Sequence, residues 1–265
     1  LSNVEGLGKD TSEQQKGIRR LLRKVEVQTK ANLAAFIDVY SRWQLCTIQL
    51  NENATALRSN TSAYKDDSGI ESQRLTKMLG IFKNYTTFLC SLGGVLVKVG
   101  DDVHTPTVDT KKRQTQPIEN SKKSDESSSQ EIKKVDDKKK KQIQLSEDLI
   151  KDLLSLINSP HNYINKTVAN TIGVDLSPAL YGVLFSNMDA KVKEFYDASE
   201  GTLKVTTESS QFVEQAILLV QYIIDHAQEN SRDLQSTDFE TLVFSFVQYA
   251  SQMVKDKDLI RRLKL

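Results

Sequence analysis

Apolar residues recur every three to four positions along most of this chain, and few residues interrupt the pattern. The 265 residues include only four prolines and 11 glycines, too few to punctuate a fold of many short strands and tight turns. Spacings of three, four and seven place apolar side chains on one face of a helix. The sequence therefore predicts an all-α protein of about ten helices.

A charged stretch divides the helical pattern into two blocks. Between residues 103 and 142 the chain has no Phe, Trp or Tyr, and its aliphatic residues are isolated. Such a composition buries too little apolar surface to offset the entropy lost on ordering. We expect an N-terminal helical block at 1–102, a disordered Lys/Ser/Asp-rich linker at 103–142, and a C-terminal helical block at 143–265 that continues beyond the fragment.

The N-terminal block is predicted to begin with a helix capped by Ser12. Asn32 is the expected cap of a second helix, which ends before a polar loop over residues 51–69. A further helix follows, with Asn84 as a candidate cap within its apolar sequence. The side chains expected to face inward are Ile18, Leu21, Leu22, Val25, Phe36, Val39, Tyr40, Trp43, Ile48, Leu75, Met78, Leu79 and Phe82.

The C-terminal block carries clearer helix boundaries. One helix is predicted from Ser146 to the Ser159-Pro160 pair, and the next should stop at a left-handed cap formed by Gly173. Ser177 and Pro178 have the residue types that cap and begin a third helix. Its inward face is predicted to comprise Leu180, Leu184, Met188, Val192 and Phe195.

The next segment carries two adjacent apolar stripes, and a helix with such a wide apolar face suits contact with neighbours on two sides. The stripes are Phe212, Ala216, Leu219 and Ile223, and beside them Val213, Ile217, Val220 and Ile224. The following helix opens with Thr237 and Glu240 in capping-box spacing. Its apolar positions are Phe239, Leu242, Val243, Phe246, Val247, Ala250, Met253 and Val254, and Leu259, Ile260 and Leu263 begin another helix.

Paired helices with short loops favour a stacked architecture, and no tetratricopeptide or ankyrin signature is present. Because the two-striped helix has to contact neighbours on both sides, we expect a HEAT/armadillo-like α-solenoid rather than a bundle. The long charged linker would interrupt this solenoid.

The residues that carry chemistry do not gather into a recognisable site. The three histidines have no partner at ligand spacing, and Cys46 and Cys90 are expected to be buried free thiols. Gly93 and Gly94 lack the Lys-Ser/Thr of a phosphate-binding loop, and close helix packing explains them better. We therefore predict no catalytic, cofactor-binding or metal-binding residue, no cofactor, and a function in protein interaction.

Charge and hydropathy narrow the partners and the location. With 36 basic and 35 acidic residues, the chain has no general basic footprint for nucleic acid. No signal peptide and no apolar run long enough for a transmembrane segment can be read. Because the chain starts at Leu1, we expect an internal fragment of a larger cytoplasmic protein.

Three segments resemble the helical region that precedes the catalytic domain in the neurofibromin family. They are FKNYTTFLCSLGGVL (82–96), GVDLSPALYGVLF (173–185) and QFVEQAILLVQYIID (211–225), with RRLLRKVE (19–26) and Arg42-Trp43 in matching order upstream. The matches at Leu176–Tyr181 and Phe212–Gln215 are the most specific. The linker is more charged than that of animal neurofibromin, which points to the fungal branch, the yeast inhibitory regulators of Ras.

The resemblance implies a very large GTPase-activating protein that returns Ras to its GDP form and so, in yeast, lowers cyclic-AMP signalling. Its catalytic domain, with the arginine finger, would lie downstream of Leu265, and no arginine here has the family's finger context. The implied partners are Ras, bound outside this segment, and a second copy, since the family forms homodimers through its helical arms. Peripheral association of the parent with membranes stays open.

An alternative function does not involve Ras. A HEAT-type protein-interaction adaptor would have the same helical pattern and the same lack of catalytic residues. A Ras GTPase-activating domain downstream of Leu265 would favour the first function over this one.

Overall fold

The structure is a computed structural model that describes residues 17–18, 20–27, 29–59, 68–97, 125–196, 203, 206–226, 234–235 and 237–255. These residues are almost entirely helical. The β-pairing found among them is one isolated bridge between Tyr196 and Leu203. The prediction of an all-α fold is confirmed.

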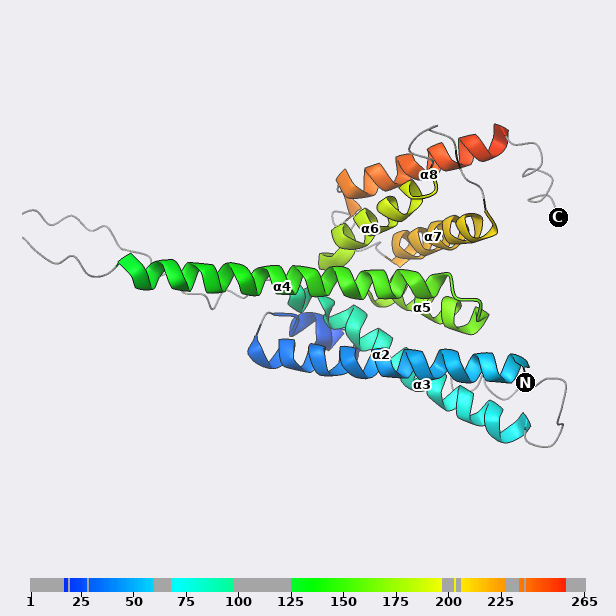
Figure 1. The fold of residues 1–265 in the computed structure, drawn as a ribbon, viewed down its shortest axis with the longest axis horizontal. Coiled ribbons are helices and arrows are strands. Elements are labelled where there is room, and N and C mark those ends of the chain that lie inside the picture. Colours follow the sequence, from blue (N-terminus) through cyan, green and yellow to red (C-terminus); the bar gives the residue numbers. More distant parts are fainter. Residues whose placement is uncertain are drawn as a thin grey trace, which may run out of the picture.

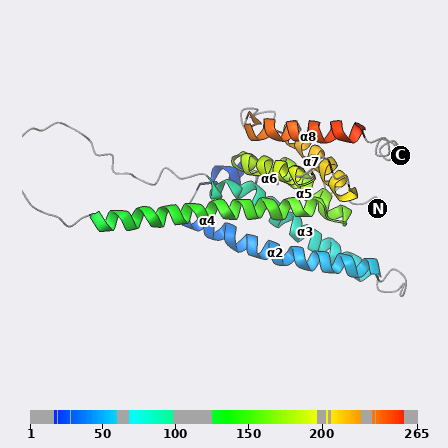
Figure 2. The same ribbon diagram turned by 45° about the horizontal axis from the view of Figure 1, so that its top comes forward.

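The principal helices of the described chain, apart from α2, form two rows (Figures 1 and 2). The helices are α2 (Lys30–Ser59), α3 (Ser68–Leu92), α4 (Asp125–Ile157), α5 (Asn162–Asp175), α6 (Tyr181–Lys193), α7 (Thr207–His226) and α8 (Thr237–Lys255), with short 3₁₀ helices η2 (Gly93–Leu96) and η3 (Pro178–Leu180). Helix α2 packs on α3 and α4 on α5. In one row α3 packs on α5 and α5 on α7, and in the other α4 packs on α6 and α6 on α8.

A single buried cluster of hydrophobic side chains runs from Phe36 in α2 to Tyr249 in α8. Hydrogen bonds also connect the early and late parts of the chain. The Ser177 amide donates to the Cys90 carbonyl at 2.8 Å, and the Thr87 hydroxyl donates to the buried Asp175 carboxylate at 3.1 Å. Both contacts join α3 to the end of α5.

Helix α4 begins much earlier than predicted. The expected start was Ser146, but the helix starts at Asp125, so residues 125–142 are helical rather than part of a disordered linker. Lys, Glu and Gln are good helix formers, and extending a helix that is already anchored avoids the cost of a new nucleus. The rest of the predicted linker, residues 103–124, lies outside the described residues.

The start of α2 is also displaced from its prediction. Thr29, not Asn32, caps the helix, because its hydroxyl accepts the Asn32 amide hydrogen at 3.1 Å. The Asn32 side chain instead donates back to the carbonyls of Val25 and Val27, at 2.7 and 3.0 Å. Helix α2 then runs to Ser59, so the first residues of the predicted polar loop are helical.

Helix α3 is continuous through Asn84, which therefore is not a cap. The prediction for Gly173 is wrong as well, because α5 passes through it to Asp175. A Cβ atom at Gly173 would overlap the Cβ of Tyr222 in α7. This glycine is required by close packing of two helices rather than by a left-handed turn. Ser177 behaves as predicted, since its hydroxyl accepts the Ala179 amide at 3.3 Å ahead of η3.

The short helical segment before α2 has most of its apolar face exposed. Residues 17–18 and 20–24 are helical, but Ile18, Leu21 and Val25 are exposed and only Leu22 of the predicted face packs against the core. The expected cap Ser12 lies outside the described residues.

The inward faces of α6 and α7 agree with their predictions except at two positions. Val213 and Val220 are buried, but Ile217 and Ile224 of the same predicted stripe are exposed. The buried predicted residues of the two helices are Leu184, Met188, Val192, Phe212, Val213, Ala216, Leu219, Val220 and Ile223.

Helix α8 starts at Thr237 as predicted. Leu242 and Phe246 are buried, together with Tyr249, which lies outside the predicted set, whereas Val243, Val247 and Ala250 are exposed. The predicted side chains of Met253 and Val254 lie outside the described ones. The helix predicted around Leu259, Ile260 and Leu263 lies outside the described residues.

Taken singly, none of the helices in the described part of the chain is both long and apolar enough to cross a bilayer. Helix α5 and the segment Pro178–Lys193 meet that criterion together, but they are bent by 109° relative to each other.

Candidate partner-binding groove

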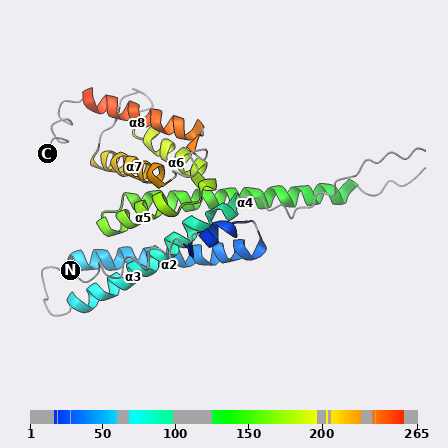
Figure 3. The same cartoon turned by 180° about the vertical axis from the view of Figure 1, so that it is seen from behind.

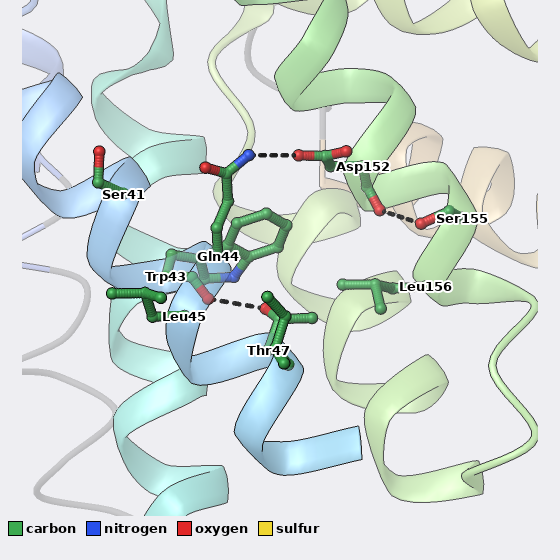
Figure 4. A pocket seen from close by; sticks show the side chains of 9 residues that line it. Ser41, Trp43, Gln44, Leu45, Thr47, Asp152, Ser155 and Leu156 are labelled. Atoms are coloured by element: carbon green, nitrogen blue, oxygen red, sulfur yellow. Dashed lines mark hydrogen bonds between the residues drawn. The ribbon is translucent and has the colours of Figure 1, made fainter. Parts of the chain in front are cut away.

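A groove of about 640 Å³ lies between α2 and α4 (Figure 4). It exists because these two helices make little direct contact in the described structure, although each packs closely on another helix of the core. Its lining residues are Ser41, Trp43, Gln44, Leu45, Thr47, Ile48, Asp152, Ser155 and Leu156.

The apolar part of the groove comes mainly from α2. Leu45 and Ile48 are 62% and 56% exposed, which is unusual for two large aliphatic side chains so close in sequence. Leu156 of α4 lies on the opposite side and is buried. Ile37, also exposed, extends the same side of α2 by two further turns at helical spacing. Together these side chains form an apolar strip along a helix rather than a single deep pocket.

The polar edge of the groove is organised around Asp152. Its Oδ2 atom accepts hydrogen bonds from the Tyr40 hydroxyl at 2.6 Å and from the Gln44 side-chain amide at 3.1 Å. The Ser155 hydroxyl donates to the Asp152 backbone carbonyl at 2.7 Å. Figure 4 shows Gln44 reaching across from α2 to Asp152 on α4. The carboxylate is therefore held in one orientation at the junction of the two helices.

Beneath this edge, stacked aromatic rings hold the α2 wall in place. Tyr40 stacks on Phe36 and Trp43, with ring centroids 6.3 and 5.9 Å apart, and Trp43 stacks on Phe82 of α3 at 6.1 Å. The Trp43 indole N–H donates to the buried Thr86 hydroxyl at 2.9 Å. The predicted core positions of Phe36, Tyr40, Trp43 and Phe82 are correct. Because these rings are packed in the core, the groove is a preformed feature of the fold.

The groove has an acidic character. Among the described residues that line it, Asp152 is the one that carries a charge. Burial raises the pKa of the Tyr40 phenol well above its ordinary value, and the negative charges of Asp152 and Asp148 raise it further. Tyr40 thus remains a neutral donor to Asp152, and the nearby Asp148 adds to the negative potential.

A second pocket, of about 430 Å³, lies among α4, α6 and the start of α7. Lys151 and Lys191 line it, but Lys151 pairs with Glu147 at 3.3 Å and Lys191 with Glu194 at 2.7 Å. Glu208 also lines this pocket. The positive charges that line this second pocket are therefore matched by acidic groups, so the pocket has no net preference for a charged ligand.

The described histidines, His161 and His226, and the two cysteines do not converge on either pocket, and His104 lies outside the described residues. His161 is buried and stacks on Tyr163, and His226 is exposed at the end of α7, where its Nδ1 lies 2.8 Å from the Tyr222 carbonyl. Cys46 is half-buried and Cys90 fully buried, and both are free. Burial raises the pKa of each thiol, and Asp175 adds to the effect at Cys90.

In the described part of the chain, no group of three or more His, Cys, Asp or Glu residues is arranged to hold a metal ion. The groove itself was not predicted. Ile48 was expected to face inward, and neither Leu45 nor Asp152 was singled out. Leu45 carried a usable signal, since it falls off the inward stripe set by Tyr40 and Trp43.

A search with the chain finds no protein-family model that matches it. The likeness to the neurofibromin family therefore rests on the sequence segments quoted above, and the function that it implies is a proposal.

Proposed function

We propose that this chain is a non-catalytic α-solenoid scaffold segment of a large Ras GTPase-activating protein, a negative regulator of Ras and, in yeast, of Ras–cyclic-AMP signalling. The observation that carries the scaffold part is the alternation of packing, in which α3, α5 and α7 follow one another in one row and α4, α6 and α8 in the other. Stacked helix pairs of HEAT or armadillo type are built in this way. Figure 3 shows the rows from behind.

The Ras part of the proposal is supported by the neurofibromin-like segments. In this proposal the parent is cytoplasmic, can associate peripherally with membranes, and binds Ras through a domain outside these 265 residues. Self-association as a homodimer belongs to the same proposal.

The second candidate function is a HEAT-type interaction adaptor unrelated to Ras. The groove between α2 and α4 favours an interaction role in either case, because it exposes apolar side chains on a preformed surface.

The two candidates are separated by measuring phosphate release from Ras-GTP. We expect the complete parent protein to accelerate hydrolysis by a factor on the order of 10³–10⁵, the range of an arginine finger, and the 265-residue chain by less than about tenfold. The parent with its finger arginine replaced is the matched control and should lose the acceleration. Strong acceleration by the 265-residue chain would overturn the non-catalytic part. A complete parent without activity would overturn the Ras part and leave the adaptor.

A further inference from the structure

The groove between α2 and α4 is shaped for a helix rather than for a small molecule. Ile37, Leu45 and Ile48 follow one side of α2 over about three turns, a length of about 16 Å. Leu156 and Asp152 on α4 form the facing wall. Amphipathic helices bind in such grooves through apolar anchors at helical spacing.

The charge of the groove selects for a cation on the occupant. Both hydrogen bonds to the Asp152 side chain fall on Oδ2, and among the described residues Oδ1 accepts none, so this atom can receive a further donor. Asp148 lies close enough to act on the same Tyr40 phenol. A complementary helix therefore carries Lys or Arg beside its apolar stripe.

The described chain itself contains a helical segment of this kind, at residues 17–18 and 20–24, followed directly by Val25. Ile18, Leu21 and Val25 are 54%, 64% and 48% exposed, at spacings of three and four. Arg20, Arg23 and Lys24 are exposed around the same turns. The exposed apolar positions of α7 lack such cations, because that helix contains no Lys or Arg.

Contacts within the same copy hold this helical segment in place. The Glu26 side chain lies against Gly94 of η2, and Leu22 packs on the core. Asn32 then fixes the following turn through its bonds to the carbonyls of Val25 and Val27. Among the described residues, the apolar side chains Ile18, Leu21 and Val25 therefore stay exposed, with Lys24 one turn from Leu21, and they are available to a second molecule.

We infer that residues 17–25 of one copy dock into the α2/α4 groove of a second copy, with Leu21 among the apolar side chains and a basic side chain paired with Asp152. This inference rests on the self-association included in the proposed function and gives it a surface. Two copies that exchange this contact about a twofold axis make it twice. Each contact is small, so we expect a weak, reversible dimer with a Kd on the order of 10 µM, and weaker at high salt.

The test uses a charge swap in the full 265-residue chain, followed by sedimentation velocity. One variant is Asp152→Lys, and the other combines Arg20→Glu with Lys24→Glu. Each alone places like charges at the contact and should sediment as a monomer. An equal mixture again pairs opposite charges at both contacts and should form a dimer, because the groove altered by Asp152→Lys receives the acidic helix and the unaltered groove receives the basic one.

Two exposed apolar positions supply the controls, should Asp152→Lys disturb the fold. Leu45→Glu, in the groove, should abolish the dimer, and Ile224→Glu, on a similarly exposed position of α7, should leave it intact. The inference is overturned if the unaltered chain stays monomeric up to about 200 µM, if Leu45→Glu still forms the dimer, or if the mixture does not restore it. A monomeric chain whose complete parent still activates Ras hydrolysis would refute this contact while leaving the Ras-regulating function intact.

Discussion

Neighbouring side chains on α7 differ sharply in how much they contribute to the fold. Leu219 and Val220 belong to different predicted stripes, and both are buried, whereas Ile217 is exposed by nearly half. Charge introduced at a buried position loses its hydration and has no partner there. The same charge at an exposed position remains hydrated.

We expect Leu219→Asp and Val220→Asp each to unfold the chain or lower its melting temperature strongly, because truncating such a buried side chain alone costs roughly 2–5 kcal/mol. Ile217→Asp and Glu214→Ala should change the free energy of unfolding by about half a kcal/mol or less. Thermal melts followed by circular dichroism compare the four variants. If either buried Asp variant melts like the unaltered chain, the inference that α7 contacts helices on both sides is wrong.

Tyr40 makes the stability of the folded chain fall at alkaline pH. Its hydroxyl is kept protonated in the folded chain, whereas in the unfolded chain a tyrosine ionises near its ordinary pKa of about 10. Below that pH the folded state gains fully from the bond to Asp152. As the pH rises past it, the unfolded state loses a proton that the folded state retains, so stability falls.

Accordingly, Tyr40→Phe should lower the free energy of unfolding by about 1.5–3 kcal/mol at neutral pH, the contribution of one hydrogen bond to a charged acceptor. The difference between the two proteins should shrink as the pH rises from about 9 to about 11. Urea unfolding at a series of pH values measures it. A difference that is constant or grows with pH would contradict the role assigned to this hydroxyl.

At the scale of whole helices, the close packing of α5 against α7 requires a residue without a side chain at Gly173. The Cβ of Tyr222 occupies the space that a side chain at Gly173 would need. Because a Cβ atom moves only with its backbone, the two helices would have to separate. Gly80 provides the contrast, since it lies within α3 and a Cβ there would meet no atom within 4 Å.

Gly173→Ala should destabilise the chain by roughly 1–3 kcal/mol through overpacking, despite the better helix propensity of alanine. Gly80→Ala should stabilise it by up to about 1 kcal/mol, since only the propensity changes. Both are read from denaturant midpoints. Equal shifts of the same sign would show that packing at Gly173 is looser than the structure indicates.

These elements also show what could be predicted from the sequence. Helical spacing identified the helices and most buried positions, as at Leu184 and Met188, because that spacing is set within each helix. It could not separate the buried Val220 from the exposed Ile217, since exposure depends on where the next helix lies. Gly173 was misassigned for the same reason, and Asp152 became notable only once α2 and α4 lay side by side.

For the molecule as a whole, the buried cluster couples the two ends of the described chain. Trp43 is the single tryptophan and lies at the α2 end of the core, while Leu184 lies in α6. The division into blocks at 1–102 and 143–265 stays a prediction, but the cluster runs through both. A continuous core favours one cooperative transition.

We therefore expect urea unfolding to give the same midpoint by Trp43 fluorescence and by far-ultraviolet circular dichroism. Leu184→Ala should move both midpoints together, because its cost of roughly 2–5 kcal/mol is felt by a single folding unit. Ile224→Ala, at an exposed position, should move neither. A fluorescence midpoint that ignores Leu184→Ala would mean that the two ends unfold independently.

The N-terminal half of helix α4 extends beyond the part of the helix that packs in the core. At 33 residues the whole helix is about 50 Å long, and the buried side chains described for it fall between Gln142 and Ile157. The part from Asp125 to residue 141, about 25 Å, extends past the other helices (Figures 1 and 3). A tilt of about 10° at the anchored half would swing the Asp125 end by about 4 Å. A small adjustment of α4 at the α2/α4 groove would thus produce a larger displacement of its Asp125 end.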